Sequence, residues 1–164
     1  MGSLILVRHG QASFGEKNYD KLSELGHLQA RLLGKFFKEE GLVFDKFFTG
    51  NMSRQLETLR EINQDAEPNI LKGLNEYDAE ALMISNFSGN LPEDIFKDRK
   101  SYFRNIRSAM KNWQDGGLNV KNNTWVNFKI GVLDSLYKMA QNKDDNILAV
   151  SSGGPISLIV TEIL

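Results

Sequence analysis

A short apolar run near the start of the chain, Leu4–Val7, leads directly into Arg8, His9 and Gly10. An uninterrupted apolar run of this length is typical of a strand that is covered on both faces, as in a parallel sheet. The next residues, 11–20, are mostly polar and contain a glycine, which predicts a loop. The pattern therefore places an arginine and a histidine at the carboxyl end of a buried strand.

Helical spacing begins after Ser23, a favourable N-cap residue, and stops at Gly41. The apolar residues that keep this spacing are Leu25, Leu28, Leu32, Leu33, Phe36 and Phe37. A second strand is predicted at 43–50 and a weaker third strand at 69–75. Between them, Ser53 is predicted to cap a polar helix that runs to about Asn63. Strands that alternate with helices favour an α/β fold with a parallel sheet.

Residues 77–123 contain no convincing strand pattern, and we interpret them as a helical insertion over one end of the sheet. Pro92 predicts the start of one helix, which ends before Gly116. Its apolar stripe comprises Phe96, Phe103, Ile106, Met110 and Trp113. Thr124 predicts the cap of another helix. The inward positions of that helix are predicted to be Val126, Ile130, Leu133, Leu136 and Tyr137.

The last stretch, residues 146–164, predicts a strand, a turn of small residues and a helix. The helical pattern runs to the final residue without a C-cap, whereas a parallel sheet normally continues after such a helix. We therefore expect a sheet that is truncated at its C-terminal edge, with an exposed edge through which two copies could pair. No linker separates the insertion, so residues 1–164 are interpreted as a single domain.

Composition narrows the function further. The formal net charge of -1 gives no reason to expect binding to nucleic acid or to an anionic membrane surface, and no stretch has the length of a transmembrane helix. The chain has no cysteine, which excludes disulfides, thiolate metal sites and a cysteine nucleophile, and is compatible with the reducing cytoplasm where we expect the protein. Two separate histidines cannot build a transition-metal cluster either.

Three groups of residues stand where the predicted parallel strands end, which is where such sheets bind ligands. Arg8 and His9 follow the first strand, Arg54 follows the second, and residues 151–154 follow the last. The helix starts that come next offer unpaired N–H groups and a positive dipole end. Two guanidinium groups add charge and paired donors that suit phosphate oxygens. The arrangement predicts a phosphate pocket.

A neutral imidazole in such a pocket can attack phosphorus and become a phosphohistidine. Neighbouring arginines stabilise charge on the transferred group and keep the imidazole neutral. A carboxyl group is then needed to protonate the leaving oxygen, and the third strand ends in Glu76, Tyr77 and Asp78.

Five blocks of sequence, taken together in this order, resemble the histidine phosphatase (phosphoglycerate mutase-like) superfamily: LVRHGQAS, LSELGHLQARLLG, TGNMSRQLET, LNEYD and VSSGGPIS. The resemblance covers nearly the whole chain. It implies a three-layer α/β/α sandwich with a mostly parallel central sheet. It also implies an enzyme that needs no metal or cofactor and acts on a phosphorylated small molecule or a phosphoprotein.

The resemblance also implies roles for single residues. His9 would be the nucleophile and Glu76 the proton donor, with Asp78 as a neighbouring candidate. We expect the phosphate to be bound by Arg8, Arg54, Ser152, Gly153, Gln11 and Thr58.

Two positions depart from the family pattern. Ser152 stands where the family usually has a second histidine, and a serine cannot carry its positive charge. Losing one preorganised donor can cost about a hundredfold or more in rate. Gly15 stands where mutases of the family often have asparagine, which argues against mutase activity.

Two functions follow as hypotheses. The first is a phosphatase that hydrolyses a phosphate monoester or a phosphorylated protein side chain through phospho-His9. The alternative is a catalytically weak or inactive phosphate-binding scaffold or sensor, because the second histidine is Ser152. A nucleotide-binding domain is a weaker third interpretation, since no G-x-G-x-x-G or P-loop lysine pattern follows a strand.

Overall fold

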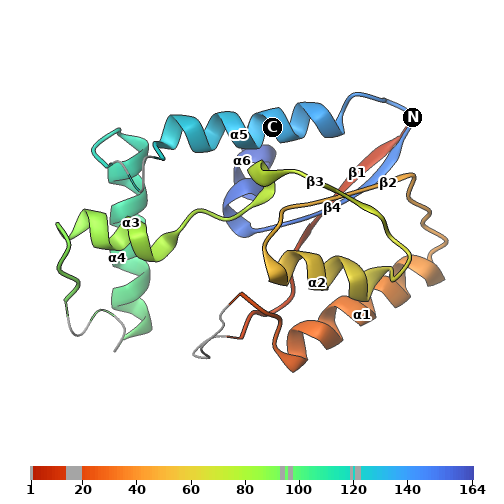
Figure 1. Cartoon of the computed structure of the whole chain (residues 1–164), viewed down its shortest axis with the longest axis horizontal. Coiled ribbons are helices and arrows are strands. Elements are labelled where there is room, and N and C mark those ends of the chain that lie inside the picture. The colour runs from red at the N-terminus through yellow and green to blue at the C-terminus, as the bar shows by residue number, and fades with distance from the viewer. Residues whose placement is uncertain (1, 14–19, 93–94, 96–97, 119, 121–122) are drawn as a thin grey trace. The chain divides into compact units, whose positions relative to one another are not determined.

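The computed structural model describes the whole chain except residues 1, 14–19, 93–94, 96–97, 119 and 121–122 (Figure 1). The chain forms two compact units. The first consists of residues 1–76 with 131–164, and the second of residues 77–130. The assignment of residues 1–164 to a single domain stays a prediction.

Four parallel strands form the sheet of the first unit, in the order β1-β4-β2-β3. They are β1 (Ser3–Arg8), β2 (Lys46–Thr49), β3 (Pro68–Ile70) and β4 (Asn146–Ser151). Residues 147–151 of β4 are all buried because this strand lies between two neighbours and is covered on both faces. The predicted α/β class with a parallel central sheet is confirmed.

The register of the sheet brings three strand ends together. Arg8 lies opposite Ser151 across the β1–β4 pair, and Thr49 lies opposite Val150 across the β2–β4 pair. The carboxyl ends of β1, β2 and β4 therefore meet at one edge, where parallel sheets present their ligand sites.

The direction of the connections sets the layers. α1 (Glu24–Glu39) leads from β1 to β2 and α2 (Ser53–Ile62) from β2 to β3, and right-handed crossovers in the same direction put both helices on one face. Figure 1 shows these two helices side by side against the sheet. The return to β4 runs in the opposite direction, so the last turns of α5 (Trp125–Met139) cover the other face. α6 (Gly153–Ile163) follows β4 and contacts β1.

One apolar core joins the sheet to α1 and α2. Its buried members are Val7, Phe37, Leu59, Leu148 and Val150. These residues come from two strands and two helices far apart in the sequence, so burying them fixes how the helices lie on the sheet.

Helix α1 begins as predicted but buries a narrower face. The Ser23 hydroxyl accepts a hydrogen bond from the N–H of Gly26 at 3.1 Å, which confirms the N-cap. Four of the apolar residues predicted to keep the helical stripe are instead 45% to 56% exposed: Leu25, Leu28, Leu32 and Phe36. The buried face contains the small residues Gly26 and Ala30, which let α1 approach its neighbours closely.

Helix α2 corrects another prediction. Ser53 is its first residue and not its cap, because Met52 occupies the cap position. The N–H of Ser53 donates to the carboxylate of Asp20 at 2.9 Å. A side chain distant in sequence therefore satisfies this helix end, and local sequence patterns cannot reveal such a partner. The predicted third strand is shorter than expected: β3 is followed by a 3-10 turn, η1 (Lys72–Leu74).

The second unit contains α3 (Ala79–Asn86), α4 (Arg99–Gln114) and the start of α5. Its core is aromatic, with the ring of Trp113 5.3 to 5.8 Å from those of Tyr77, Trp125 and Phe128. The predicted start at Pro92 is wrong, because Asp98 caps α4 by accepting from Lys100 and Ser101.

The predicted stripes of α4 and α5 are partly wrong. In α4 Trp113 is buried but Phe103 is 52% exposed, and Phe96 lies outside the described residues. In α5 the predicted inward residues Val126, Ile130 and Tyr137 are 52% to 62% exposed. The buried apolar residues of α5 are Phe128, Val132, Leu136 and Met139. Apolar residues occur all round this helix, so their spacing did not select one face.

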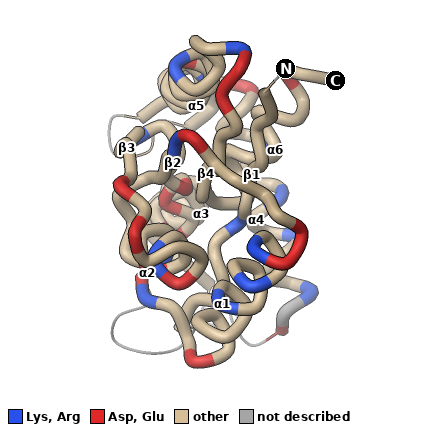
Figure 2. The backbone as a smooth tube through the Cα atoms, turned by 90° about the vertical axis from the view of Figure 1, so that its right-hand side faces the viewer, with Lys and Arg blue, Asp and Glu red and all other residues tan. Residues whose placement is uncertain are grey.

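Charges of both signs are interspersed along the described backbone, as Figure 2 shows for α1 and α2. This distribution agrees with the net charge of -1. Within the same residues, every helix is too short or too polar to cross a bilayer.

Gly26 provides a test of how the sheet edge is packed. A methyl group at this position would collide with the backbone of Gln11, so Gly26→Ala should lower the free energy of unfolding by about 1–3 kcal/mol. Gly131→Ala is the matched control, because a methyl group there meets only the Gly73 Cα at 3.9 Å. This control should be neutral or stabilising by up to about 1 kcal/mol. Chemical denaturation measures both, and equal effects would contradict the packing described.

Candidate active site

His9 lies immediately beyond β1 and is held by the neighbouring strand. Its backbone N–H donates to the carbonyl of Ser151 at 3.0 Å, which continues the β1–β4 ladder by one residue. The imidazole is thereby fixed at the sheet edge, where it meets the start of α2.

The two ring nitrogens of His9 have different partners. Nδ1 lies 2.7 Å from the carbonyl oxygen of Gly10, and Nε2 lies 3.1 Å from Nε of Arg54. A carbonyl oxygen can only accept and a guanidinium nitrogen can only donate. These partners select the tautomer with its proton on Nδ1 and its lone pair on Nε2. The nitrogen that faces Arg54 is therefore the nucleophilic one.

The surroundings lower the pKa of His9 below its ordinary value of 6.5. Burial is the main cause, because it disfavours the charged imidazolium. The Gly10 carbonyl acts against this by raising the pKa, the guanidinium groups of Arg54 and Arg8 lower it, and the carboxylate of Asp20 raises it. The net effect keeps the imidazole neutral at neutral pH.

Arg54 is buried, being only 5% exposed, and its guanidinium contacts both His9 and Asp20. Nε donates to His9, and Nη1 donates to the Asp20 carboxylate at 2.7 Å. The other oxygen of Asp20 accepts from the N–H of Ser53. Asp20 thus fixes the guanidinium against the first turn of α2. Asp20 is not predictable from the sequence, because an acidic residue in a polar loop carries no signal of a distant partner.

Thr58 lies one turn after Arg54 and is 1% exposed. Its hydroxyl accepts from the N–H of Gly10 at 3.0 Å and donates to the carbonyl of Arg54 at 2.7 Å. Both contacts are with backbone, so the hydroxyl joins the loop of the nucleophile to the helix of the arginine. Direct phosphate binding by Thr58 stays a prediction.

Glu76 and Arg8 both lie close to Gly153, the first residue of α6. The Glu76 carboxylate accepts from the N–H of Gly154 with both oxygens at 3.1 Å. A methyl group on Gly153 would lie 3.7 Å from that carboxylate and 4.0 Å from Nε of Arg8. Arg8 is exposed, and its guanidinium and the Glu76 carboxylate both neighbour the start of α6. Asp78, the neighbouring candidate, caps α3 by accepting from Ala81.

Ser152 is the cap residue of α6 and is fully buried. Its hydroxyl accepts a hydrogen bond from Nε2 of Gln55 at 2.9 Å, and Gln55 is fully buried as well. The hydroxyl is therefore committed to an internal partner. A role of Ser152 in phosphate binding stays a prediction, as it does for Gly153.

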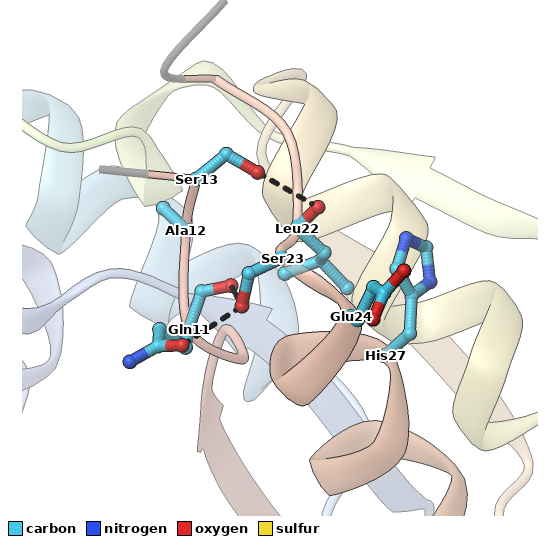
Figure 3. A pocket seen from close by; sticks show the side chains of 7 residues that line it. All are labelled: Gln11, Ala12, Ser13, Leu22, Ser23, Glu24 and His27. Carbon is cyan, nitrogen blue, oxygen red and sulfur yellow. Dashed lines mark hydrogen bonds between the residues drawn. The ribbon is translucent and has the colours of Figure 1, made fainter. Parts of the chain in front are cut away.

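Gln11 lies on the loop between His9 and α1, and its backbone N–H donates to Gln29. Its side-chain oxygen accepts from the Ser23 hydroxyl at 2.9 Å, at the wall of a pocket of about 480 Å³ (Figure 3). The residues that line this pocket are Gln11, Ala12, Ser13, Leu22, Ser23, Glu24 and His27. Phosphate binding by Gln11 stays a prediction.

His27, the second histidine, lies within α1 and pairs with Glu61 of α2 at 2.7 Å. It therefore links two helices and does not replace the residue absent at Ser152. Among the described residues, the acidic side chains and histidines form no group of three or more that could hold a metal ion.

The side chains described so far make a coherent chemical set. A neutral imidazole presents a lone pair, a buried guanidinium lies directly beside it, and a second guanidinium and a carboxylate flank the start of α6. Such a set can bind an oxyanion, attack its central atom and protonate a leaving oxygen.

The sequence and fold of this chain are similar to those of known proteins. A family model described as the histidine phosphatase superfamily (branch 1) matches residues 4–164. A 2,3-bisphosphoglycerate-dependent phosphoglycerate mutase from Parvibaculum lavamentivorans is 41% identical over 86 aligned positions, which cover 46% of this chain and 41% of that protein. The chain spans less than half the length of the curated relatives that it matches.

Solved structures share the fold at low sequence identity. The α-ribazole phosphatase of Shigella flexneri has a TM-score of 0.68 at 20% identity, with 98% of this chain and 78% of that chain covered. A phosphoserine phosphatase of Entamoeba histolytica, solved with 3-phosphoglyceric acid, has a TM-score of 0.65 at 22% identity, with the same coverage. At such identities the likeness establishes the fold.

Asp20→Asn tests the electrostatic balance at His9. Asparagine keeps an acceptor oxygen for Arg54 but removes the negative charge that raises the pKa of His9, so that pKa should fall further. An NMR pH titration of the His9 imidazole measures the shift. Glu57→Gln is the control. The Glu57 carboxylate lies on α2, as Arg54 does, but accepts from the N–H of Leu22, so this substitution should leave the pKa of His9 unchanged. An unchanged or raised pKa in Asp20→Asn would contradict the balance.

Proposed function

The chain belongs to the histidine phosphatase superfamily (branch 1), and from this premise we propose that it is a phosphatase that hydrolyses a phosphate monoester through a phosphohistidine on His9. The substrate is a phosphorylated small molecule or a phosphorylated protein side chain. The proposal rests on one observation above all: the Gly10 carbonyl and the Arg54 guanidinium leave His9 neutral with its lone pair on Nε2.

In the first step, Nε2 of His9 attacks the phosphorus of the ester. An N–P bond forms while the ester P–O bond breaks, and the leaving oxygen takes the proton of the Glu76 carboxyl group. The guanidinium of Arg54 exchanges its contact with Nε2 for a phosphoryl oxygen. Arg8 and the backbone N–H of Gly153, the first residue of α6, stabilise the remaining charge.

In the second step, water attacks the phosphorus of the phosphohistidine. The water gives one proton to the Glu76 carboxylate as its oxygen bonds to phosphorus and the N–P bond breaks. Inorganic phosphate leaves, and both His9 and the protonated Glu76 are restored. The positive charges of Arg8 and Arg54 favour the dianionic phosphoryl group throughout.

We propose hydrolysis and not mutase activity. A mutase must return the phosphoryl group to a bound hydroxyl, whereas a phosphatase transfers it to water. The Shigella flexneri and Entamoeba histolytica structures are of phosphatases, while the matched Parvibaculum lavamentivorans relative is a mutase. Gly15, which argues against mutase activity, lies outside the described residues.

A second candidate function is phosphate binding with little or no turnover. The observation that favours it is the burial of Ser152, whose hydroxyl accepts a hydrogen bond from the buried amide of Gln55. At this position the site offers neither a charge nor an exposed donor. A scaffold or sensor would use the same arginines to hold a phosphorylated ligand.

His9→Asn tests the covalent step. Hydrolysis of a panel of phosphate monoesters should fall by about 10⁴-fold or more, because the variant lacks the nucleophile. Quenched reactions of the unmodified protein should show acid-labile phosphate on His9. His27→Asn is the matched control and should keep both signals. Phosphate binding with no turnover and no phosphohistidine in the unmodified protein would establish the second candidate.

Arg54→Gln tests the anion site separately from the chemistry. Removing a buried charged donor should weaken the binding of inorganic phosphate by about 10- to 100-fold in isothermal titration calorimetry. Arg60→Gln, an exposed arginine at the end of the same helix, should bind phosphate normally. Equal affinities in the two variants would contradict the assignment of Arg54.

A further inference from the structure

A fully buried amide lies next to the site, and the mechanism does not use it. Gln55 directly follows Arg54 in α2 and has no exposed surface. Burying an amide is unfavourable unless its polar atoms find partners. Its Nε2 donates to the carbonyl of Leu74 at 2.7 Å and to the Ser152 hydroxyl at 2.9 Å, while its oxygen accepts from the N–H of Met52 at 3.4 Å.

These partners come from three separate segments. Leu74 ends η1, Ser152 caps α6, and Met52 caps α2. The carbonyl of Leu74 also accepts from the Ser151 hydroxyl at 2.8 Å. Two side chains from different segments therefore converge on one carbonyl and fix the turn to which it belongs.

Glu76 is two residues beyond that carbonyl and is held by the same segments. Its backbone N–H points at the sulfur of Met52 at 3.4 Å, and its carboxylate accepts from the N–H of Gly154. Gln55 thus contacts both segments that hold Glu76. One is the turn at Leu74, which precedes Glu76, and the other is the start of α6, where the N–H of Gly154 binds its carboxylate.

We infer that Gln55 is a positioning residue, which holds the turn at Leu74 and the start of α6 at the separation that brings the Glu76 carboxyl group to the leaving oxygen. The inference rests on the proposed function for the role of Glu76, but the geometry can be tested without it. A merely space-filling Gln55 would affect all substrates equally, whereas a positioning role is specific to the protonation step.

The test compares two esters that differ in their need for an acid. The leaving oxygen of p-nitrophenyl phosphate departs without protonation, whereas that of glycerol 2-phosphate requires it. Glu76→Gln should lower kcat on glycerol 2-phosphate by about 100-fold or more and on p-nitrophenyl phosphate by only a few-fold. Gln55→Leu should show the same selectivity, with about a tenfold or greater loss on the alkyl ester alone.

The two changes should also be strongly non-additive, because they affect the same step. Gln55→Leu combined with Glu76→Gln should be no slower than Glu76→Gln by itself. Gln64→Leu, the same change at an exposed position after α2, is the control and should retain both activities. Ser151→Ala is a second, milder variant that removes the other donor to Leu74, and it should show a smaller loss of the same selectivity.

The backbone amide signal of Gly154 in NMR spectra provides a measure that needs no turnover. It should move in the same direction in Glu76→Gln, Gln55→Leu and Ser151→Ala, because each loosens the bond to the carboxylate. A Gly154 signal unmoved by the last two variants would overturn the inference, as would equal losses on both esters. A moved signal in a protein that hydrolyses neither ester would support the positioning role and contradict the proposed function.

Discussion

The contact between Nε2 of His9 and Nε of Arg54 is the interaction on which the rest of the site depends. A histidine nucleophile must be neutral and must present a lone pair, yet it must also lie beside the cations that attract phosphate. The structure satisfies both requirements with one arrangement. The Gly10 carbonyl accepts a hydrogen bond from the Nδ1–H, and the guanidinium faces the lone pair of Nε2 until an anion arrives.

The surrounding fold maintains this contact through buried polar groups. Thr58 ties the loop after His9 to the backbone of Arg54, and Asp20 holds the outer side of the guanidinium. Buried or half-buried polar groups of this kind are costly unless each has a partner, so they tolerate few alternative arrangements. The apolar sheet beneath provides stability, and the polar contacts provide the direction in which each functional group points.

Features with local signals could be predicted from the sequence. The strand before Arg8, the serine cap of α1 and the strand that ends at Ser151 all depend on neighbouring residues, and the structure confirms their positions. The predicted burial of the first strand is wrong, because β1 lies at the edge of the sheet and only Val7 within it is buried. The juxtaposition of strand ends followed from the rule that parallel strands end at one edge. His9 and Arg54 are in contact there, and Glu76 accepts from the start of α6, which follows β4.

Other features depend on partners distant in the sequence. Asp20 accepts from the N–H of Ser53, the first residue of α2, from 33 residues away, and Gln55 reaches Ser152 across 97 residues. No local pattern distinguishes these side chains from ordinary polar residues. The inward faces of α1 and α5 were misjudged for a related reason: apolar residues occur on several sides of each helix, and only tertiary packing selects the buried one.

The protonation state of His9 tests the central claim most directly. Nitrogen chemical shifts of the imidazole, measured at neutral pH on the protein labelled with ¹⁵N, distinguish a protonated ring nitrogen from one with a lone pair. The account predicts a neutral ring with its proton on Nδ1 and a bare Nε2. A doubly protonated ring, or a proton on Nε2, would contradict it.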